Sequence, residues 1–408
     1  MQKIRFSGKS AVLSLLCIGF VLNSLPMEAE QFFYKHKTGD KYRIISTVHE
    51  EVYQNRRLTH RSEILNRIAA EIQDIQGGVA AHTAVFQTAE RAVGVNGEHS
   101  FQWEREYQSA FGRDKWGLLT IDTQYFMPVV RNVPVFPDRD LNPGDTWSAE
   151  GHEMHDFREG FGIPDPYRIP FTANYTFLGN REWKEQTYPT FSVSYRIFTE
   201  PDTISGTRYP VRIMGASDQV VYWDAGLGQP AAYQEQFRMV FELSDGRTLE
   251  YRGRAEAETI ESTTMDKEKI AQDIADDIAR LGIEDVSVRV TDDGIVLNLE
   301  NIQFHPDSAV WLPGEEQKLD TIAEILMHYQ ERDILVGGHT ALAGSANSRM
   351  QLSQQRASVV ADYLIEKKVR TVDRILVRGY GAEKPLGDNR NETGRQQNRR
   401  VEITILEN

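Results

Sequence analysis

The feature of the sequence that most constrains its fold is a two-residue alternation on both sides of one tight turn. Apolar and polar residues alternate over 237–243 and again over 249–256, and Asp245 and Gly246 lie between the two runs. Alternation of period two gives each run one core-facing side, and an Asp-Gly pair favours the turn of a two-stranded hairpin. The sequence therefore predicts antiparallel β-structure in this region.

The same kind of pattern extends over most of the chain before residue 263. Runs with strand periodicity occur over 42–53 and 190–198. Two segments that contain prolines and glycines, 128–144 and 160–170, are typical of long loops. We therefore expect residues 30–262 to form an antiparallel β-rich domain.

The pattern changes to helical spacing directly after this region. Isoleucines recur at helical intervals from residue 270 to 278, and Gly282 follows as a helix C-cap. Strand alternation then resumes over 286–299 around an Asp-Asp-Gly turn. Residues 263–300 are therefore predicted to be a helix and a hairpin that connect two domains.

Residues 1–29 have the composition of a secretory signal peptide. Basic residues precede an apolar run over 11–25, which is too short for a comfortable membrane span, and cleavage is expected after Ala29. An uncleaved N-terminal anchor is the alternative. The single cysteine, Cys17, lies in this segment directly after two leucines, which disfavours lipidation. The mature chain is therefore expected in the periplasm, without cysteines or disulfides.

The charge of the chain argues against one class of partner. The sequence has 46 basic and 60 acidic residues, a formal net charge of -14 at pH 7. Proteins that bind nucleic acid usually carry a basic patch or domain, so no nucleic acid is expected as a partner. Residues 301–408 carry nearly equal numbers of acidic and basic side chains, which supports a domain boundary near residue 301.

One segment, His152-Glu153-Met154-His155, has the residue types of a metal site. Its histidines are three residues apart, whereas the zinc-protease motif requires His-Glu-x-x-His on a helix, and we interpret the segment as a solvated polar loop. The sequence contains no nucleophile elbow, P-loop or dinucleotide-binding fingerprint. The protein is therefore predicted not to be an enzyme and to use no cofactor or metal.

The last part of the chain, residues 301–408, mixes strands with helices. Its predicted order is β-α-β-α-β-β, with a loop over 389–398 before the closing strand. Two helices would then cover one face of a small mixed sheet. The predicted fold class is α+β, an N-terminal antiparallel β-rich domain followed by this smaller domain.

Five short segments indicate what kind of domain this is. In chain order they are Phe-His-Pro-Asp-Ser-Ala at 304–309, Gly-His-Thr at 338–340, Leu-Ser-Gln-Gln-Arg-Ala at 352–357, Gly-Tyr-Gly at 379–381 and Gly-Arg-Gln-Gln-Asn-Arg-Arg-Val-Glu at 394–402. Together they resemble the signature of the OmpA-like C-terminal family, which includes peptidoglycan-associated lipoproteins and flagellar stator proteins. The Gly-His-Thr-Ala form is also similar to spirochaete members of that family.

The resemblance implies a non-covalent grip on the diamino acid of the peptidoglycan stem peptide. In the family, an aspartate after Gly-His-Thr takes the ammonium group of the ligand, and an arginine in the Leu-Ser-x-x-Arg-Ala helix takes its carboxylate. Arg356 matches that arginine, but Ala341 stands in place of the aspartate and Arg349 in place of a usual asparagine. The predicted site comprises Thr340, Ala341, Arg349, Ser353, Arg356, Asn398 and Arg399.

Several of these residues also have simpler interpretations. On a helix, Arg349, Ser353 and Arg356 would share one face, and docking requires the Arg356 guanidinium to face an open cleft. Asn398 could instead fix the loop before the last strand, and Arg399 could form ion pairs at the sheet edge. His339 is expected to pack or to hydrogen-bond rather than to catalyse.

The changed site leaves two hypotheses about function. A site that has lost an anion and gained a cation suits a carboxylate or phosphate, so a cell-envelope structural protein could bind peptidoglycan with modified specificity. Alternatively, the domain no longer binds peptidoglycan, and the protein is a periplasmic scaffold, or a carrier whose β-domain binds a lipid or an outer-membrane or periplasmic protein partner. For that β-domain, we favour a soluble fold over an outer-membrane barrel because some strands have mixed outward faces.

Overall fold

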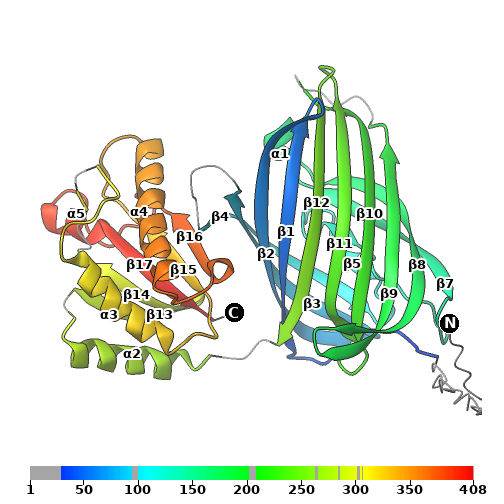
Figure 1. The fold of residues 1–408 in the computed structure, drawn as a ribbon, viewed down its shortest axis with the longest axis horizontal. Coiled ribbons are helices and arrows are strands. Elements are labelled where there is room, and N and C mark those ends of the chain that lie inside the picture. The colour runs from blue at the N-terminus through cyan, green and yellow to red at the C-terminus, as the bar shows by residue number, and fades with distance from the viewer. Residues whose placement is uncertain are drawn as a thin grey trace, which may run out of the picture.

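A computed structural model of the chain describes residues 29–93, 100–201, 208–261, 265–283, 285–300, 304–305 and 307–407. The predicted signal peptide, apart from Ala29, lies outside the described residues. A large sheet occupies the N-terminal part and a smaller domain of strands and helices the C-terminal part (Figure 1). In the described part of the chain, we find no helix with the length and apolar character needed to cross a membrane.

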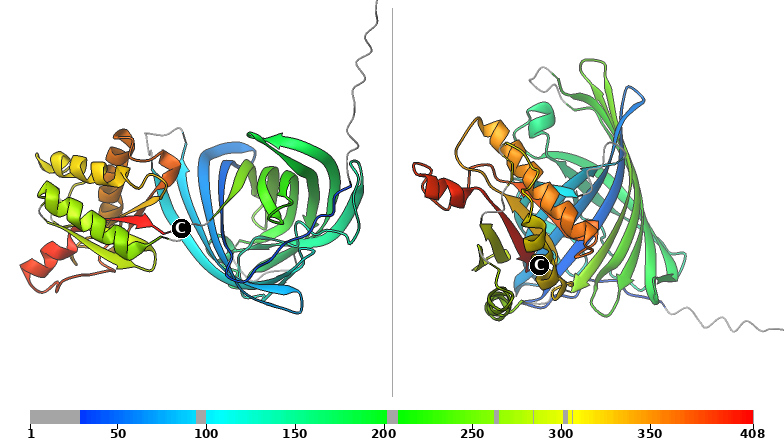
Figure 2. Two further views of the ribbon diagram at one scale, coloured as in Figure 1. Left: turned by 90° about the horizontal axis from the view of Figure 1, so that it is seen from below. Right: turned by 60° about the vertical axis from the view of Figure 1, so that its left-hand side comes forward.

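The N-terminal domain is an antiparallel sheet of long strands. Its elements are β1 (Lys41–Gln54), β2 (Arg57–Gln76), β3 (Val79–Ala92), β4 (Phe101–Asp114), β5 (Leu119–Ile121), β6 (Val130–Arg131), β7 (Thr146–His155), α1 (Arg158–Phe161), β8 (Tyr167–Trp183), β9 (Gln186–Thr199), β10 (Pro210–Asp224), β11 (Gln229–Leu243) and β12 (Thr248–Glu261). Neighbours in the sheet follow the order β5-β4-β3-β2-β1-β12-β11-β10-β9-β8-β7-β6. The sheet curves strongly, so that one face becomes the inside of a trough (Figure 2).

Alternation along the strands places an aromatic core on the inner face of this trough. On β9, Phe191 and Val193 are buried, whereas Phe198, on the opposite face, is 67% exposed. Phe191 packs with Phe32, from the segment before β1, and with Trp223 of β10, at ring-centroid distances of 5.4 and 6.2 Å. The contact with Phe32 is edge-to-face, a geometry that adds to the free energy gained from burial.

The predicted strands and one predicted loop can be compared directly with this sheet. The hairpin around Asp245 and Gly246 is formed by β11 and β12, and the runs over 42–53 and 190–198 lie in β1 and β9. The prediction of a loop around His152 and His155 is wrong, because these residues belong to β7. Glu153, between them, accepts a hydrogen bond from Tyr195 in the core, and His155 Nε2 lies 2.6 Å from Glu153 Oε2.

The C-terminal domain packs helices on one face of a mixed sheet. Its elements are α2 (Lys267–Leu281), β13 (Val286–Thr291), β14 (Gly294–Glu300), α3 (Glu315–Met327), β15 (Ile334–Gly338), α4 (Ala346–Glu366), the 3₁₀-helix η1 (Val372–Arg374), β16 (Ile375–Gly379), α5 (Glu392–Asn398) and β17 (Arg400–Leu406). The sheet order is β13-β14-β17-β15-β16, and the β15–β16 pair is parallel. Helices α2, α3 and α4 share one buried apolar cluster with this sheet.

The residues predicted to be a connector belong to the C-terminal sheet and core. Strand β14 pairs antiparallel with β17, and Ile274 and Ile278 of α2 are buried in the same cluster as Leu297 of β14. Gly282 ends α2 in the left-handed conformation, as its position predicted. The sequence prediction of a loop over 389–398 is wrong in one respect, because the last seven of those residues form the short helix α5.

The two domains join along an edge of each sheet. Strand β16 continues the N-terminal sheet by pairing parallel with the start of β4, Leu376 opposite Phe101. The opposite side of the C-terminal sheet from the helices contributes Leu335, Leu376 and Leu406 to an apolar cluster with Leu65 and Phe101 of the N-terminal sheet. The two sheets are thus joined by a pair of hydrogen-bonded strands and by a shared apolar cluster.

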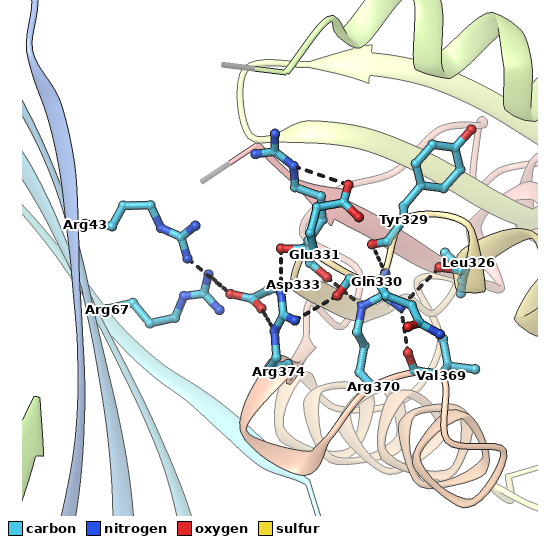
Figure 3. A network of polar contacts seen from close by, with 11 residues as sticks. Arg43, Arg67, Leu326, Tyr329, Gln330, Glu331, Asp333, Val369, Arg370 and Arg374 are labelled. Carbon is cyan, nitrogen blue, oxygen red and sulfur yellow. Dashed lines mark hydrogen bonds and ion pairs between the residues drawn. The ribbon is translucent and has the colours of Figure 1, made fainter. Parts of the chain in front are cut away.

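A buried carboxylate reinforces this contact. Asp333, 1% exposed, directly precedes β15 and accepts from Arg67 of β2 at 2.5 Å and from Arg374 of η1 at 2.6 Å (Figure 3). Arg43 of β1 approaches the same carboxylate at 3.4 Å. Burial by itself would raise the pKa of Asp333, but the charges of Arg67, Arg374 and Arg43 outweigh that effect and hold its pKa below the ordinary value.

Candidate functional site

The predicted site lies where the start of α4 crosses the end of β15. A Cβ added to Gly338, the last residue of β15, would lie 2.0 Å from the backbone oxygen of Ser353. Only glycine lets helix and strand approach this closely. Gly338 of the Gly-His-Thr motif therefore has a packing role, because it allows α4 to lie close against the sheet.

The Ser353 side chain forms hydrogen bonds within the domain. Its hydroxyl group donates to the carbonyl oxygen of Met350 at 2.8 Å and accepts from the Gly381 amide at 2.9 Å. The residue is fully buried. It therefore joins α4 to the loop after β16 and does not line a cleft, although it lies on the helix that carries Arg349 and Arg356 as the sequence predicted.

Arg356 lies beneath the segment that precedes α3. Its Nε donates to the carbonyl oxygen of Ser308 at 2.9 Å, and its guanidinium carbon lies 4.7 Å from the centre of the Phe304 ring. Burial lowers the pKa of Arg356, Arg399 lowers it further, and Asp307 acts in the opposite direction. With 9% of its surface exposed, Arg356 does not face the open cleft that we predicted for it.

The loop after β15 carries the remaining candidates that lie beside α4. Ala341 is 6% exposed, and no carboxylate stands in its place. The Thr340 amide donates to the Gly381 carbonyl oxygen at 2.8 Å, but the buried Thr340 Oγ1 has no hydrogen-bond partner. Arg349, next to Gly381, donates from Nη1 to the Gly344 carbonyl oxygen and keeps a buried Nε without a partner. Thr340 and Arg349 thus each keep one unsatisfied polar side-chain atom.

Asn398 and Arg399 are engaged in the loop before β17. Asn398 Oδ1 accepts from the amides of Leu386 and Gly387 at 2.7 and 2.9 Å, and its Nδ2 donates to the Gly387 carbonyl oxygen. Arg399 donates to Glu392 at 2.6 Å. The simpler interpretation of Asn398, that it fixes this loop, agrees with these contacts, and Arg399 is held in an ion pair.

His339 is packed inside the domain. It is 2% exposed, and its ring stacks on Tyr380 at a centroid distance of 4.9 Å. Burial lowers the pKa of His339, whereas the nearby Glu402 raises it. Glu402 also receives a hydrogen bond from Arg400 at 2.9 Å. This buried arrangement supports a packing role for His339.

Sequence reasoning did not identify the residues that cover Arg356. Phe304 and Ser308 precede α3 and reach α4 through a bend that includes Asp307, whose φ of 49° is in the left-handed region. A local pattern could not indicate which helix such a bend contacts. In the described part of the chain, no group of three or more histidine, cysteine, aspartate or glutamate side chains is arranged to hold a metal ion.

The C-terminal domain is similar in sequence to several known proteins. The family model described as "OmpA family" matches residues 303–399. The chain is 39% identical over 121 residues to the probable lipoprotein YiaD of Escherichia coli (strain K12), an alignment that covers 29% of this chain and 55% of that protein. It is 36% identical over 104 residues to the peptidoglycan-binding protein ArfA of Mycobacterium bovis, covering 26% of this chain and 32% of that protein.

A similar solved structure is that of an outer membrane protein from Borrelia burgdorferi B31. It is 37% identical in sequence, and the match covers 30% of this chain and 96% of that one, with a TM-score of 0.26. The chain spans about half the length of YiaD and about a third of ArfA. These similarities therefore concern one domain and not the whole protein.

Proposed function

Because residues 303–399 belong to the OmpA family, we propose that this protein is a structural, non-enzymatic component of the bacterial cell envelope whose C-terminal domain associates with peptidoglycan. ArfA, a similar protein, is named for peptidoglycan binding. We propose that the peptidoglycan-binding site is modified in this chain. The ligand group that it holds is a carboxylate, and Arg349 rather than Arg356 is the cation that receives it.

The observation that carries this proposal is that two of the candidate residues, Thr340 and Arg349, each keep an unsatisfied side-chain atom. Thr340 Oγ1 and Arg349 Nε are buried without hydrogen-bond partners, although such atoms are costly to leave unpaired. A hydroxyl group and a guanidinium together can donate to a carboxylate. Ala341 supplies no anion for an ammonium group, so the ammonium group of a zwitterionic diamino acid would have no partner at this position.

Cosedimentation of the purified full-length protein with sacculi from its own cells tests this proposal. Wild type is expected to sediment, and Arg349→Gln is expected to weaken binding by about 10- to 100-fold, because a hydrogen bond to a charged group contributes roughly 1.5–3 kcal/mol. Arg390→Gln is the matched control, since the Arg390 side chain is 91% exposed and pairs with Asp388 in its own turn. It should bind like wild type.

The Ala341→Asp variant distinguishes this proposal from the alternative that the domain no longer binds the cell wall. If wild type does not sediment but Ala341→Asp does, the domain has the family fold without a working site and the modified grip is refuted. If both sediment, and only Ala341→Asp is competed by free diaminopimelate, the changed specificity is supported.

A second candidate function, that of a periplasmic scaffold or carrier, is favoured by the position of Arg356. Its Nε is occupied by the Ser308 carbonyl oxygen and its guanidinium is stacked on Phe304, so the family's carboxylate-binding residue is covered. In this alternative the domain serves to hold the N-terminal domain in place. Failure of every variant to sediment would support it.

We also propose that the outer face of the N-terminal sheet is exposed to water and not to lipid. Cross-strand ion pairs lie on it, such as Arg196 with Asp218, whose side chains are 61% and 58% exposed. Charges of this kind are costly against lipid. The mature protein is therefore expected in the soluble fraction after extraction without detergent, and a chain that stays with membranes after a high-salt wash would contradict this.

A further inference from the structure

The inside of the N-terminal trough contains a cavity of about 850 Å³. Strands from both halves of the sheet line it, together with the segments before β1 and after β5. Its volume is within the range of small-molecule sites. Apolar side chains form much of its wall: Ile44, Ile68, Phe86, Met127, Val130 and Val221.

A buried histidine with an unpartnered ring nitrogen is among the residues that line this cavity. His82 is 3% exposed and stacks on Phe111 at a centroid distance of 5.0 Å. Its Nδ1 lies 3.4 Å from the Tyr42 hydroxyl group, whereas its Nε2 is buried without a partner. With Tyr42 as donor to Nδ1, the ring proton is on Nε2, which can donate to a ligand.

A cation without an anion lies beside this histidine. The guanidinium carbon of Arg113 lies 4.6 Å from the Tyr34 ring centre, and its buried Nε has no hydrogen-bond partner. Burial and the charge of Arg113 lower the pKa of His82 to about 3. Among the described residues, no carboxylate forms an ion pair with Arg113. A partly buried cation of this kind favours an anionic ligand.

The acidic residues of the cavity do not supply that anion. Asp40 is exposed, at the rim. Glu235 is engaged by the Ser217 hydroxyl group, which donates to it at 2.6 Å, and by Gln219. Burial raises the pKa of Glu235, so this carboxyl group favours its neutral form.

We infer that this cavity binds a single-chain amphiphile whose anionic head, a carboxylate or a phosphate, is held by Arg113 and His82 and whose alkyl tail lies along the apolar wall. Arg113 and His82 provide the donors for the head, and the remainder of the cavity has the volume and apolar character for a tail. The inference gives the carrier alternative a ligand class. It does not depend on wall binding, because every residue that lines the cavity belongs to the N-terminal domain.

Isothermal titration calorimetry of the full-length mature protein tests the inference. Decanoate and decyl phosphate are titrated below their micelle concentrations, with decyltrimethylammonium, acetate and inorganic phosphate as comparison ligands. We expect saturable one-to-one binding of at least one decyl anion, and much weaker binding of the cation and of the tail-less anions. Shortening the tail should weaken binding by about fourfold for each methylene group removed from the wall.

Two variants locate the ligand. Arg113→Gln keeps a polar side chain but removes the guanidinium charge, and should weaken binding of the decyl anion by about 10- to 100-fold. Arg181→Gln, on the exposed end of β8, is the matched control and should not change the affinity. Ile44→Trp fills the cavity from the wall and should weaken binding of decanoate without weakening that of acetate.

Each alternative outcome has a clear meaning. Equal binding of the decyl cation and the decyl anions, or unchanged affinity in a folded Arg113→Gln variant, would overturn the assignment of an anionic head. Equal affinity for phosphate and decyl phosphate would show an anion site without a tail site and would also overturn the inference. Failure of sacculus binding by the same preparation would leave the calorimetric result unaffected, so the two proposals can fail separately.

Discussion

Replacing Asp333 by alanine is expected to reduce the free energy of unfolding by about 3–5 kcal/mol, because it removes the carboxylate with which the buried Arg67 pairs. Arg67 is 6% and Arg43 8% exposed, and both come from the N-terminal sheet, so the loss falls on the contact between domains. Urea unfolding followed by circular dichroism measures the loss. Limited proteolysis should cut the variant faster between the domains.

Asp218→Ala is the matched control for this prediction. It breaks an ion pair whose two side chains are more than half exposed, so it should change the stability by no more than about 1 kcal/mol. Asp333→Ala combined with Arg67→Ala should destabilise less than the sum of the single changes, because the second substitution removes an orphaned charge. Equal effects of Asp333→Ala and Asp218→Ala would contradict a buried ion-pair network.

The same carboxylate predicts how stability depends on pH. The pKa of Asp333 is lowered in the folded protein, so the group contributes stability above the unfolded pKa of about 4 and loses it as the pH falls through the folded value. The stability of wild type should therefore fall on acidification below about pH 4. Asp333→Ala should lose less stability than wild type over the same interval.

The second large effect is expected in the N-terminal core. Phe191→Ala should reduce the free energy of unfolding by about 3–5 kcal/mol, because the Phe191 ring is fully buried among aromatic neighbours and its removal leaves a cavity. Phe198→Ala, the same change on the same strand, affects a side chain that is 67% exposed and should change stability by about 0.5 kcal/mol or less. Similar losses in the two variants would mean that the inner and outer faces of β9 are assigned wrongly.

Local periodicity predicted those elements whose pattern is complete within a few residues. The hairpin of β11 and β12 and the helix ended by Gly282 both carry their own turn or cap, so the sequence alone located them. The loop prediction around His152 failed because a polar His-Glu-Met-His segment was interpreted as solvated. In the folded chain, Glu153 instead points into the core, where the distant Tyr195 donates to it.

The candidate site was predictable in its helix but not in its surroundings. The spacing of Arg349, Ser353 and Arg356 placed them correctly on α4. Which of them stays accessible depends on segments far apart in the chain, Ser308 over Arg356 and Gly381 against Ser353. Asp333 lies in a short charged segment, and nothing local distinguishes it from a solvated turn before the N-terminal arginines are in place.

The pairing of β16 with the start of β4 affects the tendency of the protein to self-associate. A strand edge with free amide and carbonyl groups is a template for joining another chain, and here each domain covers part of an edge of the other. Separating the two domains would uncover both edges at once, together with the apolar side chains of Leu376 and Phe101. The intact chain thus protects itself against self-association, whereas its separated halves would tend to aggregate.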